Sequence, residues 1–150
     1  ESWKNASSKL LIIGSGQQKD SLNQLITDCN LNEKITIVDE VPQKKLIEYY
    51  KKSSMLIISS RNEGGPRVAL EALYLKIPVV STDVGHMSEI LPRELLAKPD
   101  NLSSLTDLVE RYVGDDSYKQ DSIFKYVTEE FSLPAKAKQT LAIYKELLVS

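Results

Sequence analysis

The chain has 150 residues, of which 41% are hydrophobic and 27% are charged, and its formal net charge is −2. This size and balance predict one globular domain over residues 1–150. The weak negative charge excludes a broad basic surface for nucleic acid. The one cysteine, Cys29, excludes an internal disulfide and a cysteine-based metal cluster. No apolar run approaches about 18 residues and no signal-peptide pattern is present, so we expect a cytoplasmic protein without a membrane span.

Short apolar runs alternate with helical patterns along the chain. Strands are predicted at residues 9–13, 35–38, 55–59, 78–81 and 94–97. Helices are predicted at residues 18–29, 42–53, 66–75, 87–91, 103–113, 116–131 and 134–149. This alternation is typical of an α/β fold, a Rossmann-like parallel sheet with helices on both faces.

The first predicted helix carries an apolar row. Leu22, Leu25, Ile26 and Cys29 fall on one face at helical spacing, which predicts that this face is buried. Cys29 then reads as a small core hydrophobe. Asn30 follows directly and is expected to end the helix in a left-handed conformation.

Five of the six glycines lie in loops that follow predicted strands, at residues 14–17, 60–65 and 82–87. The carboxyl ends of the strands are where parallel sheets bind ligands, and glycine lets a ligand approach the backbone closely. These loops, together with residues 39–42, are therefore the candidate site.

The first of these loops contains Gly14-Ser15-Gly16, between a strand and a helix. Backbone N–H groups in such a turn can face an anion. The third glycine of the dinucleotide fingerprint is absent, because Lys19 occupies its place. A tight turn without a ligand and a phosphate contact therefore explain this motif equally well.

The stretch from residue 54 to residue 85 is more informative. Gly64 and Gly65 expose main-chain N–H groups just before a helix, and these can donate to phosphate or sugar oxygens. Glu71 follows on a mostly apolar helix, where a carboxylate needs a partner. That partner is either Arg67, four residues earlier, or the hydroxyl groups of a ligand such as a ribose.

Two further polar residues have less specific explanations. Glu63 lies in the loop and could be a solvated turn residue, although it stands at a strand's carboxyl end, eight residues before Glu71. His86, the one histidine, has no metal-ligand spacing around it, so a surface loop position is favoured.

From Leu10 to nearly its end, and most specifically at residues 54–91, the chain resembles the C-terminal, donor-binding domain of retaining glycosyltransferases of the GT-B fold, in the large family 4 group. The similarity rests on LLIIGSG, ITIVDEV, SSMLIISSRNEGGPRVALEALYLKIPVVSTDVG, SEIL and the closing FSLPAKAKQTLAIYKELL. The specific part is the Glu-x7-Glu element of Glu63 and Glu71, followed by Pro-Val-Val and Thr-Asp-x-Gly.

The resemblance implies a role for each matching position. Glu71 would bind the ribose hydroxyls of a nucleotide diphosphate sugar, and Glu63 would contact the transferred sugar beside the reacting centre. Backbone N–H groups would face the sugar and the diphosphate at Gly64, Gly65, Arg67 and Val68.

The remaining implied contacts involve the nucleotide. The turn at Gly14 and Gly16 would lie at or near the diphosphate, and the main chain around Val38 and Asp39 would hold the base. Family members typically need no metal or other cofactor for the chemistry, so none is expected here. Basic side chains and a helix dipole would stabilise the leaving diphosphate instead.

The chain also departs from the family pattern. Asp39, Lys76 and His86 replace usual glycines, and Gly65 replaces a frequent aromatic residue. Asp39 bears on base contacts, whereas His86 and Gly65 bear on the identity of the donor sugar.

The family's first strand–helix unit, with its Gly-Arg…Lys-Gly signature, and its N-terminal acceptor-binding domain have no counterpart in these residues. The resemblance therefore implies part of a larger enzyme of polysaccharide or glycolipid synthesis, inactive alone, with peripheral membrane association of the whole. The alternative is a non-catalytic subunit of the same fold that serves a partner glycosyltransferase.

Overall fold

The computed structural model describes residues 8–65, 67–113 and 120–149. The chain divides into two compact units, Glu1–Lys52 and Ser53–Ser150, and each is considered by itself. The expectations for residues 1–7 and 116–119 lie outside the described residues. The expectation of one domain over residues 1–150 stays a prediction.

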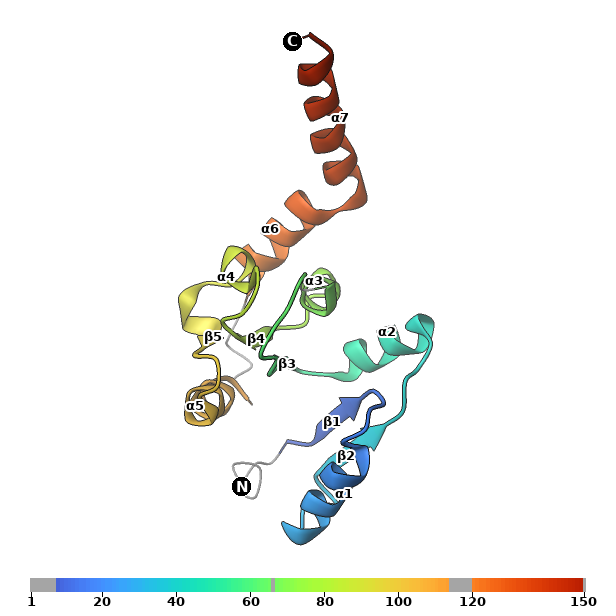
Figure 1. Ribbon diagram of the computed structural model, residues 1–150, viewed down its shortest axis with the longest axis vertical. Coiled ribbons are helices and arrows are strands. Elements are labelled where there is room, and N and C mark those ends of the chain that lie inside the picture. The colour runs from blue at the N-terminus through green and yellow to red at the C-terminus, as the bar shows by residue number, and fades with distance from the viewer. Residues whose placement is uncertain (1–7, 66, 114–119, 150) are drawn as a thin grey trace. The chain divides into compact units, whose positions relative to one another are not determined.

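The first unit contains strands β1 (Leu10–Ile13) and β2 (Ile35–Val38) and helices α1 (Lys19–Asp28) and α2 (Gln43–Lys52). The two strands pair in parallel, with Leu10 opposite Ile35 and Ile13 opposite Val38 (Figure 1). Asn30 follows α1 with φ 56°, as predicted for a left-handed helix terminus.

One sequence expectation in this unit is wrong. Ile26 is buried and Cys29 is half-buried, but Leu22 and Leu25 are exposed, at 38% and 58%. A unit of this size has little surface with which to cover a helix face, because small units bury a smaller fraction of their surface. Apolar spacing therefore located α1 correctly but overstated how much of it is covered.

The second unit is built on three parallel strands in the order β3-β4-β5, namely β3 (Leu56–Ile58), β4 (Val79–Thr82) and β5 (Leu96–Ala97). Its helical segments are α3 (Arg67–Tyr74), α4 (Met87–Ile90), the 3₁₀ turn η2 (Arg93–Leu95), α5 (Leu102–Tyr112), α6 (Asp121–Phe131) and α7 (Leu133–Val149). Parallel strands joined through helices confirm the predicted α/β class.

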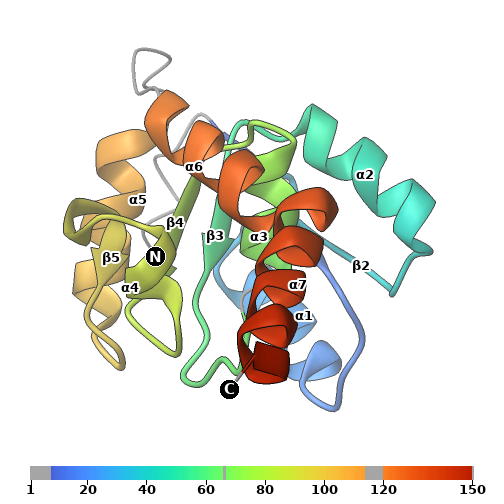
Figure 2. The same ribbon diagram turned by 90° about the horizontal axis from the view of Figure 1, so that it is seen from above.

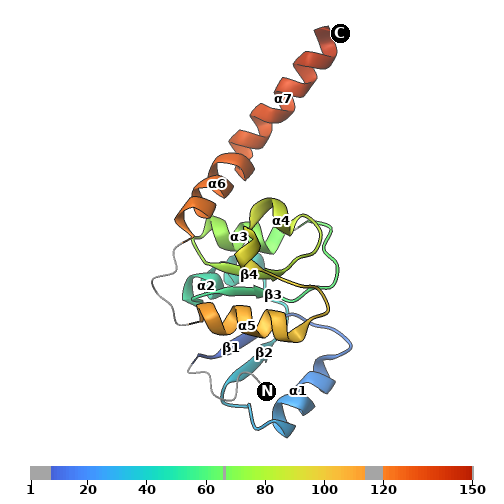
Figure 3. The same ribbon diagram turned by 90° about the vertical axis from the view of Figure 1, so that its left-hand side faces the viewer.

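Helices cover both faces of this second sheet. Helix α3 packs on β3 and β4 and also contacts α6, whereas α5 packs on β4 and β5. Figures 1 and 3 show α3 and α6 on one side of the strands and α5 on the other, and Figure 2 shows α6 against α3. All four residues of β4 are buried, as expected for a central strand covered on both faces.

A side chain completes the pairing of β4. Gln120 is 1% exposed, accepts a hydrogen bond from the Val79 backbone N–H and donates one to the Val79 carbonyl, both at 3.1 Å. Gln120 precedes α6 and makes no side-chain cap on it. Its amide thus mimics a peptide group of a neighbouring strand, beside a part of β4 that β5 does not reach.

Lys76 occupies the turn between α3 and β4 with φ 61°, a conformation that favours glycine. This explains physically why a glycine is usual here. Lys76 therefore adopts a backbone conformation in which a non-glycine residue is strained.

Candidate functional site

The loop after β3 carries Glu63, and hydrogen bonds from inside the unit fix its shape. The Ser60 hydroxyl donates to Glu63 Oε1 at 2.6 Å, and both groups are partly buried. The Thr82 hydroxyl, at the end of β4, donates to the Ser60 carbonyl at 2.6 Å. The carboxyl ends of two neighbouring strands are therefore linked through this loop.

Gly85 holds the same loop from the other side. Its φ is +57°, and a Cβ at this position would lie 2.2 Å from the Glu63 carbonyl oxygen. No side chain fits at that distance, so only glycine allows the turn after β4 to pack against the Glu63 backbone. Glu63 is thus half-buried in a braced loop and differs from the solvated turn residue that the sequence left open.

The residues after Glu63 are open. Gly64 and Gly65 are exposed, and a Cβ added to either would meet no atom within 4 Å. The chain's own packing therefore does not require glycine here, which leaves close approach by a ligand as an explanation. The Arg67 N–H donates to the Gly65 carbonyl at 2.9 Å, so a phosphate would have to share or replace that bond.

Helix α3 positions Glu71 just beyond these glycines. Ala69, Ala72 and Leu73 form the face that packs into the unit and are fully buried. Glu71 is half-buried, whereas Arg67 and Val68 at the start of the helix are exposed. Glu71 therefore lies at the border between the core and solvent, where its carboxylate is accessible to a ligand.

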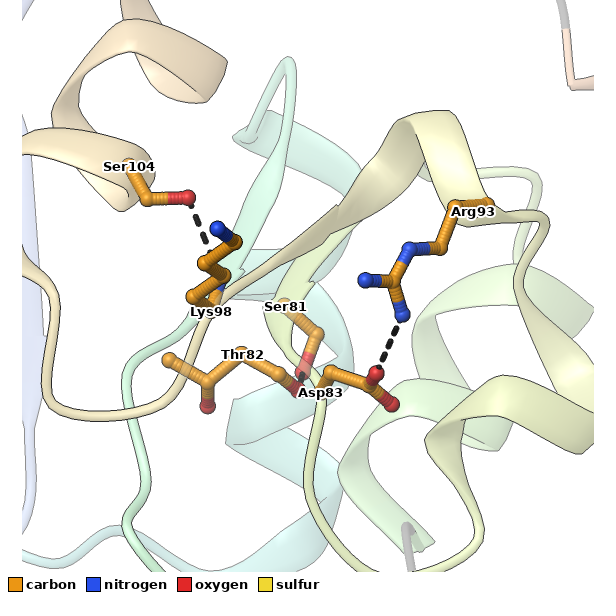
Figure 4. Close-up of polar contacts among 6 residues, drawn as sticks. All are labelled: Ser81, Thr82, Asp83, Arg93, Lys98 and Ser104. Carbon is orange, nitrogen blue, oxygen red and sulfur yellow. Dashed lines mark hydrogen bonds and ion pairs between the residues drawn. The ribbon is translucent and has the colours of Figure 1, made fainter.

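The carboxyl end of β4 continues into Asp83. Its backbone N–H donates to the Ala97 carbonyl at 2.8 Å, and its carboxylate accepts from Arg93 Nη1, also at 2.8 Å. Figure 4 shows this pair beside Thr82, with the Ser104 hydroxyl accepting from the Lys98 backbone on the other side. The two contacts of Asp83 thus tie the start of the turn that leads to Gly85 to β5 and η2.

The first unit contains the other predicted site residues. The Gly14 N–H donates to the Val38 carbonyl at 2.9 Å and so continues the strand pairing. A Cβ added to either Gly14 or Gly16 would meet no atom within 4 Å, but Gly14 has φ 150°, a conformation that favours glycine. Asp39, which follows Val38, forms an exposed ion pair with Lys19 at the start of α1.

The predicted residues therefore form two groups, one in each unit. Gly14, Gly16, Val38 and Asp39 meet at the carboxyl ends of β1 and β2. The second unit brings Glu63, Gly64, Gly65, Arg67, Val68 and Glu71 to the loop after β3 and the start of α3.

Sequence analysis missed Ser60 and Thr82. A serine three residues before Glu63 was a readable signal for a local hydrogen bond. Thr82 gave none, because its contact joins residues that are 22 positions apart.

The structure adds three further observations. His86 lies on the surface, with its side chain 62% exposed, as favoured from the sequence. Within the described ranges, no group of three or more His, Cys, Asp or Glu side chains could hold a metal ion. Of the helices described, none has the length and apolar character needed to cross a bilayer.

The second unit thus brings together the half-buried carboxylates of Glu63 and Glu71 and the exposed backbone of Gly64 and Gly65, between the carboxyl end of β3 and helix α3. The fold places the chain in the α/β class, in which loops of this kind at the carboxyl ends of parallel strands typically bind nucleotides and related anionic ligands.

The chain belongs to the family "Glycosyl transferases group 1", whose family model matches residues 2–129. It is 28% identical over 137 residues to a putative teichuronic acid biosynthesis glycosyltransferase, TuaC, of Bacillus subtilis. That match covers 88% of this chain and 33% of TuaC. The chain thus spans about a third of the length of this relative.

Solved structures agree on the GT-B fold. The C-terminal domain of a group 1 glycosyl transferase (LpcC) of Francisella tularensis superposes with a TM-score of 0.77 at 21% identity, over 87% of this chain and 73% of that one. HepE of Anabaena in complex with UDP-glucose superposes with a TM-score of 0.79 at 17% identity, over 92% and 41%. The suspected C-terminal GT-B domain is therefore confirmed.

Proposed function

We propose that the chain is the donor-binding domain of a retaining glycosyltransferase, which transfers a sugar from a nucleotide diphosphate sugar to an acceptor. The observation that carries this proposal is the braced loop that holds Glu63 half-buried, beside two exposed glycines and Glu71. HepE in complex with UDP-glucose supports the donor class. The name of TuaC, which refers to teichuronic acid biosynthesis, supports a role in polysaccharide synthesis. In this proposal the chain acts in polysaccharide or glycolipid synthesis, in the cytoplasm.

In this proposal each acidic residue has its own task. Glu71 accepts hydrogen bonds from the ribose hydroxyls, and Glu63 is the catalytic-side residue that contacts the transferred sugar. Glycine backbone at Gly64 and Gly65, with the start of α3 at Arg67 and Val68, faces the diphosphate. Partial positive charge at a helix N-terminus favours an anion there.

The first unit has its own tasks in this proposal. Gly14 and Gly16 lie at the diphosphate, and the main chain of Val38 and Asp39 holds the base. The acceptor is bound by an N-terminal domain outside these residues, so the 150-residue chain alone is inactive. The chemistry uses no metal or other cofactor, and the complete enzyme associates peripherally with the membrane.

Calorimetry with UDP and GDP tests the ribose assignment. The unaltered chain should bind at least one of them, and Glu71→Ala should weaken that binding about tenfold, because hydrogen bonds to a charged group are lost. The matched control is Glu110→Ala, which removes an exposed glutamate from α5. Arg67→Met tests the alternative partner of Glu71 and should change unfolding more than binding if that pair dominates.

Equal affinities of the unaltered chain and Glu71→Ala would overturn the assignment of Glu71. Glycosyl transfer above background by the 150-residue chain would overturn the claim that it is inactive alone.

A further inference from the structure

We propose that Ser60 is a positioning residue for Glu63: its hydroxyl orients the carboxylate so that one oxygen faces the transferred sugar. This inference rests on the proposed function and adds a residue that increases the preference for the sugar nucleotide over the nucleotide alone. Ser60 is argued to act through Glu63 and not to touch the donor itself.

The Ser60 hydroxyl donates a hydrogen bond to one oxygen of the Glu63 carboxylate. Ser60 Oγ lies 2.6 Å from Glu63 Oε1, a length typical of a strong hydrogen bond from a hydroxyl to a carboxylate. Among the residues that the structure describes, Ser60 is the one hydrogen-bond partner of the Glu63 side chain. Oε1 therefore accepts a hydrogen bond from the protein, and in this proposal Oε2 accepts one from a hydroxyl group of the sugar.

The backbone of Ser60 is itself held in place by a side chain of β4. The Thr82 hydroxyl, in a fully buried strand, donates to the Ser60 carbonyl at 2.6 Å. Gly85 meets the Glu63 backbone so closely that no side chain fits between them. Two anchors from one strand end thus fix the backbone at both ends of the Ser60–Glu63 hydrogen bond.

A Glu63 side chain that is held in one rotamer lowers the free-energy cost of binding a ligand that contacts it. A glutamate in a loop has many rotamers, and ordering it on binding costs free energy. A hydroxyl that holds one rotamer in advance removes part of that cost for a ligand that contacts Glu63. A ligand that lacks the sugar gains nothing from it, so the effect belongs to sugar recognition and not to nucleotide binding.

A purely structural role makes a different prediction. If the Ser60 hydroxyl only closes the loop, its loss should lower stability and weaken UDP and UDP-glucose binding alike. The ratio of the two affinities therefore separates positioning from loop closure.

The experiment measures the affinity of UDP and of UDP-glucose for the chain, with GDP and GDP-mannose as a second pair. Ser60→Ala should lower the preference for the sugar nucleotide about three- to tenfold, because the lost hydrogen bond acts on the ligand only through Glu63. Ser60→Thr keeps a hydroxyl and should restore the preference. Ser59→Ala removes a neighbouring exposed serine and should leave it unchanged.

A double-mutant cycle adds the decisive readout. In the Glu63→Ala background, Ser60→Ala should have no further effect on the preference, since the carboxylate that it orients is gone. The same fold-change in both backgrounds, or an equal loss for UDP and UDP-glucose, would overturn the proposal.

A ligand-free measurement keeps this inference separate from the proposed function. NMR scalar couplings of Glu63 should report one χ1 rotamer in the unaltered chain and in Ser60→Thr, and rotamer averaging in Ser60→Ala. If none of the four nucleotides bound, the donor-binding function would fail and these couplings would still decide the positioning role. Identical couplings in all three proteins would sink it.

Discussion

Two turns of this molecule share a sequence pattern but are held in different ways. Both the turn at residues 14–16 and the loop at residues 60–65 follow a parallel strand, contain two glycines and lead to a helix. The first is fixed by backbone pairing and by an exposed ion pair between Lys19 and Asp39. The second is braced by the Thr82 and Ser60 hydroxyls and by the close approach of Gly85.

The difference shows where a site acquires its rigidity. Backbone pairing at Gly14 sets the path of the chain but orients no functional side chain. In the second unit, the Thr82 hydroxyl of the buried strand β4 holds the Ser60 backbone, and the Ser60 hydroxyl contacts the Glu63 carboxylate. A strand–glycine–helix pattern therefore indicates where a ligand could approach. The hydrogen bonds and packing contacts that hold the loop determine which side chain is oriented toward that ligand.

The largest effect is expected from Gln120→Leu in the second unit. The change leaves the buried N–H and carbonyl of Val79 without their side-chain partners, which should cost about 2–4 kcal/mol of unfolding free energy. Urea unfolding measures it. Gln24→Leu, on the exposed surface of α1, should cost less than about 0.5 kcal/mol. Similar losses of unfolding free energy in Gln120→Leu and Gln24→Leu would contradict the expectation that the buried hydrogen bonds of the second unit contribute more than the surface hydrogen bond of the first.

Gly85→Ala should come next. The left-handed conformation alone disfavours alanine by about 1–2 kcal/mol, and the new Cβ would also displace the Glu63 backbone. We expect lower stability in urea unfolding and a lower preference for UDP-glucose over UDP. Gly16→Ala is the matched change in the first turn, where the Cβ has space, and should alter stability by less than about 1 kcal/mol. Tolerance of alanine at Gly85 would contradict the close packing.

The smallest effect is expected from Lys19→Met. The Lys19–Asp39 pair is partly exposed, and surface pairs contribute about 0–1 kcal/mol, with screening by salt. Urea unfolding at low and at high salt should therefore differ little between this variant and the unaltered chain. A salt-independent loss above about 1 kcal/mol would show that the first turn is braced as firmly as the second.

The sequence by itself determined the order and type of the elements. Apolar runs bounded by glycine, proline and polar residues predicted β2 with the bounds observed, and α3 with β4 to within about a residue. The Glu-x7-Glu spacing singled out Glu63 and Glu71, and Asn30 marked a left-handed turn. The elements and the left-handed turn depend on local periodicity and backbone preference, which are written in consecutive residues. The roles expected of Glu63 and Glu71 came from the resemblance to the family.

Only the tertiary structure decided how the site is braced and which apolar faces are covered. Gln120 meets Val79 across 41 positions, and Thr82 meets Ser60 across 22. Leu22 and Leu25 have core-like spacing yet are exposed. Such outcomes depend on which segments meet in space, and no local preference encodes that.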